Sequence, residues 1–123
     1  MSARDLLAFG HPMHGAPEVS RPKPDRRLVG NPQRETWNVL DAPLDGARTL
    51  STGIWRCEPG QWRIAFSPTE REIFTVLEGR CRVHRDGGGF EEAGPGQSIH
   101  IPPGFAGAFE VLQTVTKVYV IVE

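Results

Sequence analysis

Residues 60–79 read GQWRIAFSPTEREIFTVLEG, and this stretch decides the fold. Residues 61–66 alternate polar and apolar side chains, and in residues 72–77 Glu72 shares a face with Phe74 and Val76. Alternation over short segments is typical of β-strands that have one face buried. The sequence therefore predicts two strands here, with the carboxylate of Glu72 pointing into an apolar interior.

The same period of two continues through most of the chain after residue 48. It recurs in RCRVH at 80–84, in SIHI at 98–101 and in VTKVYVIV at 115–122. Turn residues separate these runs, and Asp86-Gly87 between two alternating runs is a strong hairpin signal. Roughly eight short strands in one domain predict a sandwich or a small barrel.

Composition excludes several classes of partner. The chain has 123 residues, which is the length of one domain, and its 14 Lys+Arg and 15 Asp+Glu residues give a net charge of -1. No basic field is present to hold nucleic acid or an anionic membrane. No apolar run approaches the roughly 20 residues that span a bilayer, so we expect a cytoplasmic protein. Its cysteines, Cys57 and Cys81, are then expected to be buried thiols.

Prolines divide the chain into two parts. Six of the 11 prolines lie in residues 1–47, where they disfavour a long helix or a central strand. The stretch at 11–27, HPMHGAPEVSRPKPDRR, is basic but diluted by acidic residues, which indicates a solvated segment. We predict a mobile N-terminal arm over residues 1–27 and a single domain over residues 28–123.

Two separated motifs resemble those of the cupin superfamily, G-x5-H-x-H-x3,4-E-x6-G and G-x5-P-x-G-x2-H-x3-N. The matching positions are Gly60, Glu72, Gly79, Gly96, Pro102 and Gly104. More narrowly, residues 28–123 look like the single-domain branch related to the ureidoglycine aminohydrolases. The resemblance implies an all-β, cupin-type double-stranded β-helix, or jelly-roll barrel. It also implies a homodimer, and in many members a metal ion in the barrel mouth.

The metal-ligand positions of those motifs carry other residues. Metal-binding cupins use three histidines and one glutamate, whereas the histidine positions here are Phe66, Pro68 and Gly107, and only Glu72 remains. A transition metal needs about three protein ligands to compete with water. We therefore predict no metal and no other cofactor.

Two titratable residues could act in such a barrel. In an apolar cavity, Glu72 must pair, accept hydrogen bonds or take up a proton. It could be a general acid/base, a ligand anchor, or a structural glutamate that is paired with an arginine or hydrogen-bonded across the barrel. His100 shares its strand phase with Ser98. If that phase faces the cavity, His100 and Glu72 could form an acid–base pair; otherwise His100 is a surface residue.

Aromatic side chains are the candidates for the ligand-binding walls. Trp62 and Phe66 share the presumed inward phase and could stack on a flat ligand, although aromatic residues in a barrel are more often core. The full candidate set is Trp62, Phe66, Phe74 and Phe109. Trp55 is expected to cover the barrel or to contact a dimer partner.

Three functions remain open. The first is a cupin-fold protein that binds a small polar molecule in the barrel without a metal, as a homodimer with Gly30–Pro43 lying across the partner. The second is an enzyme for C–N hydrolysis, as in ureidoglycine aminohydrolases, or an isomerase or epimerase, using Glu72 with or without His100. The third is a regulatory or structural dimer whose barrel is filled. A pocket volume separates the third from the others.

Overall fold

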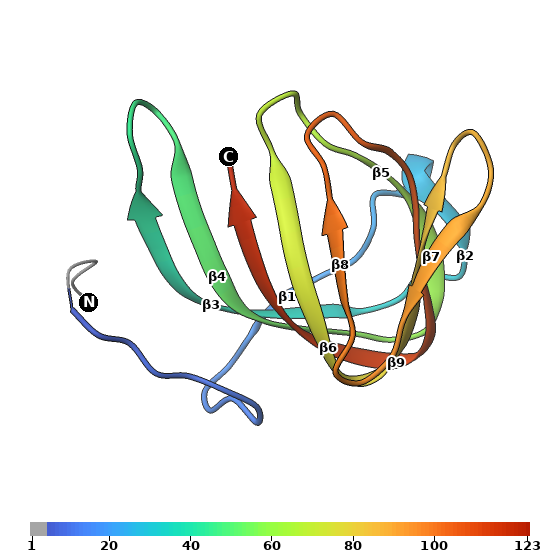
Figure 1. Ribbon diagram of the computed structural model, residues 1–123. Helices are drawn as coiled ribbons and strands as arrows, with labels where there is room; N and C mark the ends of the chain where they lie inside the picture. Colours follow the sequence, from blue (N-terminus) through green and yellow to red (C-terminus); the bar gives the residue numbers. More distant parts are fainter. Residues whose placement is uncertain (1–4) are drawn as a thin grey trace.

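The computed structural model describes residues 5–123, which form one antiparallel β-sheet curled into an open barrel (Figure 1). The all-β, cupin-type prediction is confirmed. The elements are β1 (Glu18–Ser20), η1 (Pro24–Arg26, a 3-10 turn), β2 (Arg27–Val29), β3 (Arg34–Pro43), β4 (Thr49–Cys57), β5 (Gly60–Ala65), β6 (Arg71–Arg85), β7 (Phe90–Ala93), β8 (Ser98–Ile101) and β9 (Ala106–Val122). Within the described part of the chain, no helix is long and apolar enough to cross a membrane.

Two long strands, β6 and β9, organise the barrel. They pair with each other from Arg71 opposite Val122 to Arg85 opposite Gly107. The second half of β9 also pairs with β4 and its first half with β5, while β6 carries β7 and β8 on its other edge. Because both strands bend, each belongs to two walls of the barrel, and residues far apart along the chain come to face one interior (Figure 1).

The strand phases follow the apolar alternation. On β6, Glu72, Phe74 and Val76 are buried, while Ile73 between them is 50% exposed. On β8, Ile99 and Ile101 are buried. The predicted inward position of Glu72 is therefore confirmed by its burial.

The N-terminal segment differs from the predicted mobile arm. Residues 1–4 lie outside the described residues, but Glu18–Ser20 pairs with the start of β3 and Arg27–Val29 pairs with β5. Pro17 directly precedes β1 and Pro22 follows it closely, and proline cannot donate to a sheet ladder. The sheet thus begins at Glu18. In the segment before it, the backbone carbonyl of Gly15 accepts a hydrogen bond of 3.0 Å from the Trp37 indole.

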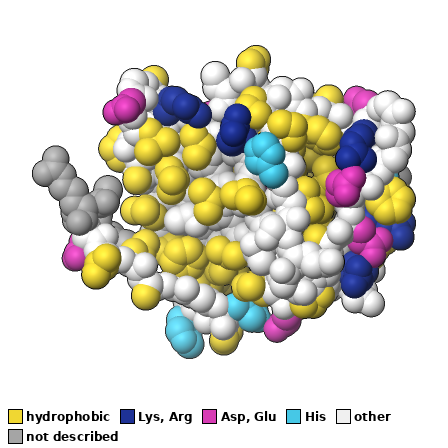
Figure 2. Space-filling model, in the orientation of Figure 1, with side chains coloured by type: hydrophobic (Ala, Val, Ile, Leu, Met, Phe, Trp, Pro, Cys, Tyr) yellow, Lys and Arg dark blue, Asp and Glu magenta, His cyan; other side chains and the backbone are white. Residues whose placement is uncertain are grey.

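One edge of the sheet is left partly open. β1 pairs only with Arg34–Thr36, so the rest of β3 has no strand on that side within residues 5–123. Hydrophobic side chains also gather over the β3, β4 and β9 side of the face seen in Figure 2. An open strand edge favours pairing with another chain, and the homodimer stays a prediction.

The two cysteines lie in the core as free thiols, as expected. Burial raises the pKa of Cys57 to about 12 and that of Cys81 to about 11. Since the thiolate is the nucleophilic form of cysteine, neither residue is a candidate for covalent chemistry.

Gly107 lies in β9 where this strand pairs with the end of β6. A Cβ atom at this position would overlap the backbone carbonyl oxygen of His84 and would lie 2.9 Å from the ring of Phe105. The strand pairing fixes that oxygen, so no side chain fits without a backbone shift. The position that carries histidine in the second cupin motif is closed to any side chain here.

We predict that Gly107→Ala lowers the free energy of unfolding by about 2 kcal/mol or more, because it overpacks a paired strand. Gly87→Ala is the matched control, since a Cβ atom there meets nothing within 4 Å. Urea unfolding of both variants measures the difference. Equal stability of the two variants would contradict the close approach of β6 and β9.

Candidate functional site

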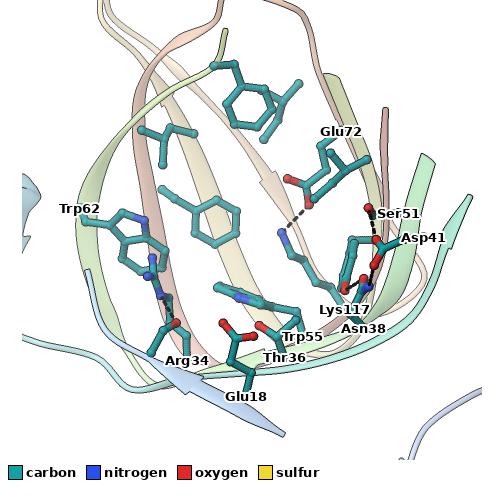
Figure 3. Close-up of a pocket in the computed structure, with 17 residues that line it drawn as sticks. Glu18, Arg34, Thr36, Asn38, Asp41, Ser51, Trp55, Trp62, Glu72 and Lys117 are labelled. Atoms are coloured by element: carbon teal, nitrogen blue, oxygen red, sulfur yellow. Dashed lines mark hydrogen bonds and ion pairs between the residues drawn. The ribbon is translucent and has the colours of Figure 1, made fainter. Parts of the chain in front are cut away.

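A cavity of about 530 Å³ lies inside the barrel (Figure 3). Its aromatic lining comes from β4, β5, β9 and the loop after β5, with Trp55, Trp62, Phe66, Phe109 and Tyr119. Its polar lining comes mainly from β1, β3 and β4, which supply exposed or half-buried side chains at the rim. The cavity therefore combines apolar walls with a polar rim, as small-molecule sites do.

An ion pair is buried in this cavity. The Lys117 ammonium donates to Oε2 of Glu72 at 2.7 Å, and the two side chains are 6% and 10% exposed. A carboxylate in an apolar interior requires such a partner, because its desolvation is otherwise uncompensated. The Glu72 partner is thus a lysine, where the sequence analysis considered an arginine.

Aromatic rings surround the Lys117 ammonium. Its Nζ lies 4.1 Å from the ring centre of Phe74, 4.5 Å from that of Trp55 and 4.8 Å from that of Phe109. The negative faces of these rings attract the cation, and the attraction strengthens when the cation is desolvated. Carboxylate and rings together stabilise a buried positive charge.

The sequence contained a signal for Lys117. In VTKVYVIV, the lysine shares its phase with Val115 and Tyr119, both of which are buried. A lone charged residue in an apolar phase must find a partner, and Glu72 is the second such residue. Because the two residues carry opposite charges and both lie in apolar strand phases, the sequence favours an ion pair between Glu72 and Lys117.

His100 does not reach the cavity. It is exposed, and it lies opposite the half-exposed Ile73 in the β6–β8 pairing, whereas Ile101 on the other phase lines the cavity. Period-two alternation puts neighbours on opposite faces, so Ile99 and Ile101 inside force His100 outside. The structure does not form the Glu72–His100 acid–base pair.

Three of the four predicted aromatic candidates, Trp62, Phe66 and Phe109, line the cavity. Trp62 stacks on Phe109, with ring centres 5.4 Å apart and an interplanar angle of 28°. Phe74 is 1% exposed and does not line the cavity, and it acts through its contact with Lys117. Trp55, expected at the barrel exterior, lines the cavity and meets Phe109 edge-on.

A hydrogen-bonded network fixes the polar groups at one side of the rim (Figure 3). Asp41 accepts hydrogen bonds from Ser51 at 2.6 Å and from Asn38 at 3.0 Å, which lower the pKa of Asp41. Asn38 in turn accepts from the Tyr119 hydroxyl at 2.7 Å, and burial raises the pKa of Tyr119 to about 12. The network holds these side chains in place at the rim.

The residues present do not fit the metal centre that the fold often holds. Phe66 has no donor atom, Pro68 has only its backbone carbonyl, and Gly107 has no room for a side chain. The remaining carboxylate, Glu72, is already paired with an ammonium. Across residues 5–123, no three His, Cys, Asp or Glu side chains gather in a way that could hold an ion.

A curled antiparallel barrel with an aromatic-walled cavity places the chain among the cupins. Residues 44–119 match the family model of the EutQ-like cupin domain, and the chain belongs to this family. The comparison with curated protein sequences gives no match.

Solved structures share the fold. A protein of unknown function from Pseudomonas syringae has a TM-score of 0.72 at 22% identity over 87% of this chain, which spans 44% of that protein. The Clostridium difficile EutQ protein has a TM-score of 0.61 at 24% identity, covering 84% of this chain and 79% of its own. A putative ethanolamine utilization protein from Salmonella typhimurium has a TM-score of 0.60 at 18% identity. The match covers 87% of this chain and 97% of that protein. At these identities the likeness shows the fold alone.

We predict that Glu72→Gln and Lys117→Met each lower the free energy of unfolding by about 3 kcal/mol, because each leaves one buried charge without its partner. The double variant should lose less than the sum of the two single losses. A double-mutant cycle in urea measures this coupling. Additive losses would show that the two charges do not stabilise each other.

Proposed function

We propose that this chain binds a small organic molecule in the barrel cavity without a metal ion. The observation that carries the proposal is the Glu72–Lys117 ion pair inside a cavity of about 530 Å³. Ligand sites commonly have volumes of about 300–1,000 Å³, with apolar walls and a few polar groups. The cavity size favours a binding protein over a barrel filled by its own side chains.

The ion pair supports the metal-free part of the proposal. A divalent cation at Glu72 would have to displace the Lys117 ammonium or lie beside a like charge in a site of low dielectric. The rings of Trp55, Phe74 and Phe109 favour keeping the ammonium where it is. The cavity therefore holds a cation of its own, supplied by the chain.

The polar side of the ligand would meet the rim, and its flat or apolar side would meet Trp62 and Phe109. The stacked pair of Trp62 and Phe109 offers ring surface. The Asp41 network offers fixed hydrogen-bonding groups. Because these groups are already oriented, little conformational freedom is lost on binding.

The enzyme alternative has less support. Its proposed acid–base pair required His100 beside Glu72, and His100 is exposed on the outer phase of β8. Hydrolysis in the manner of the ureidoglycine aminohydrolases, or isomerisation, would have to use Glu72 with Lys117. No contact in the cavity favours either reaction.

Protein purified without an affinity tag should contain far less than one equivalent of zinc, manganese, iron or nickel by elemental analysis. The expectation follows from the lack of three suitable ligands around Glu72. A chelator should leave the melting temperature unchanged. One full equivalent of metal that disappears in Glu72→Gln would contradict the metal-free site.

Binding in the cavity can be followed by tryptophan fluorescence, because Trp55 and Trp62 line the cavity and Trp37 does not. We expect a saturable change on addition of benzamide, a flat and neutral polar probe. The change should be reduced in Trp62→Phe and retained in the control Trp37→Phe. The proposed function is contradicted if no saturable change occurs, or if Trp37→Phe removes it and Trp62→Phe does not.

A further inference from the structure

A second hollow, of about 300 Å³, adjoins the barrel cavity. Four residues line both spaces: Arg34, Trp62, Ile64 and Phe66. The second hollow is basic, because Lys23, Arg26, Arg34 and Arg63 line it and Glu70 is the single acidic residue among its described lining. A molecule lying against the shared wall would therefore meet aromatic surface on one side and positive charge on the other.

Most of this positive charge is not neutralised by the chain. Arg63 is paired with Asp86 at 3.0 Å. Lys23, Arg26 and Arg34 form no ion pair within residues 5–123. Three cations thus face one hollow with no carboxylate bound to any of them.

Arg34 is held in position by neutral groups. Its Nε donates to the Ser20 hydroxyl at 3.1 Å, and its Nη2 donates to the backbone carbonyl of Arg21 at 3.1 Å. Its guanidinium carbon lies 5.4 Å from the ring centre of Trp62. Nη1 donates to no protein atom in the part of the chain that the structure describes. The guanidinium is therefore oriented and keeps a donor for a ligand, and its burial lowers the pKa of Arg34, as expected for a cation without an anion beside it.

Folding of the proline-rich segment brings the other two cations to this place. Pro22 is buried, and η1, which contains Arg26, contacts β5 beside Trp62. A segment that the sequence indicated as solvated thus packs against β5, which carries part of the shared wall. Two of its basic residues, Lys23 and Arg26, line the hollow that adjoins the cavity.

We propose that the molecule bound in the barrel carries an oxyanion, a carboxylate or a phosphate ester, which sits in the basic hollow on Arg34, Lys23 and Arg26. Its flat apolar part then lies against Trp62 and Phe66 in the shared wall. A planar guanidinium binds either kind of oxyanion through two parallel hydrogen bonds. This proposal rests on the proposed binding function and names the ligand class of the same site.

Four probes separate the contribution of the oxyanion to binding from that of the aromatic ring. They are phenyl phosphate, benzoate, neutral benzyl alcohol and inorganic phosphate. Binding to the full chain is measured by tryptophan fluorescence and by NMR. We expect phenyl phosphate or benzoate to bind about tenfold tighter than benzyl alcohol, and phenyl phosphate to bind about tenfold tighter than inorganic phosphate. The tighter of the two anionic probes identifies the oxyanion, and its affinity should fall as salt is added.

Variants locate the oxyanion. Lys23→Gln and Arg26→Gln change exposed residues, and each should weaken the anionic probe about threefold to tenfold while leaving benzyl alcohol unchanged. Arg34→Lys should weaken it more, because a flexible ammonium does not keep the fixed orientation that Ser20 and the Arg21 carbonyl give the guanidinium. Arg71→Gln is the matched control, since it removes an exposed positive charge that lines neither hollow.

Each contrary result has its own meaning. Equal binding of benzyl alcohol and both anionic probes overturns the oxyanion site and leaves metal-free binding in the cavity standing. Inorganic phosphate that binds as tightly as phenyl phosphate overturns the joined site, because the aromatic wall then contributes nothing. The same loss of affinity in Arg71→Gln as in Arg26→Gln shows a general charge effect and overturns it too. Failure of all four probes to bind overturns both proposals.

Discussion

The carboxylate of Glu72 and the ammonium of Lys117 meet 2.7 Å apart inside the barrel, and the interior depends on this contact. Without Lys117 the buried Glu72 carboxylate would have no compensating charge, and without Glu72 the ammonium would keep only the attraction of the surrounding rings. In the β6–β9 pairing, Glu72 lies opposite Ile121 and Lys117 lies opposite Val76, so four residues, or about 13 Å of strand, separate their backbone positions. Two long side chains of one face can bridge that span, and the register of the two longest strands brings them together.

The same ion pair determines which positive charge the cavity contains. A cupin barrel commonly uses a metal ion as its central positive charge, and the chain supplies a lysine ammonium instead. A lysine binds and orients, but it offers no vacant coordination position. Gly107, packed against the carbonyl of His84, closes the place of the missing ligand from the other side. Under the proposed binding function, ligand specificity would come from the aromatic walls and the polar rim.

The sequence predicts the barrel fold and the inward position of Glu72, because both follow from local patterns. Strand alternation and motif spacing are local signals, and neither depends on which strands become neighbours. The Lys117 partner is 45 residues away from Glu72, and their contact depends on the register in which β6 pairs with β9. A one-residue slip in strand register turns every side chain to the other face, so this pairing could not be read from either strand alone.

Other differences have related causes. The phase of SIHI was ambiguous because two isoleucines and two polar residues fit either face, and core packing of Ile99 and Ile101 decided it. The short strands β1 and β2 carry no alternation that three residues could display, and they form because β3 and β5 offer them open edges. The local sequence around Lys23 and Arg26 indicates solvent exposure for the same reason: the hollow that they line is created by the tertiary fold.

The most direct measurement of the central claim is a nitrogen-15 NMR spectrum of the lysine ammonium groups. The chain has only two lysines, Lys23 and Lys117, so Lys23→Gln assigns both signals. The account predicts that Lys117 gives an ammonium signal with slow proton exchange and a ring-current shift, which zinc or nickel does not alter. A Lys117 ammonium that exchanges as fast as that of the exposed Lys23, or that a metal ion displaces from Glu72, would contradict it.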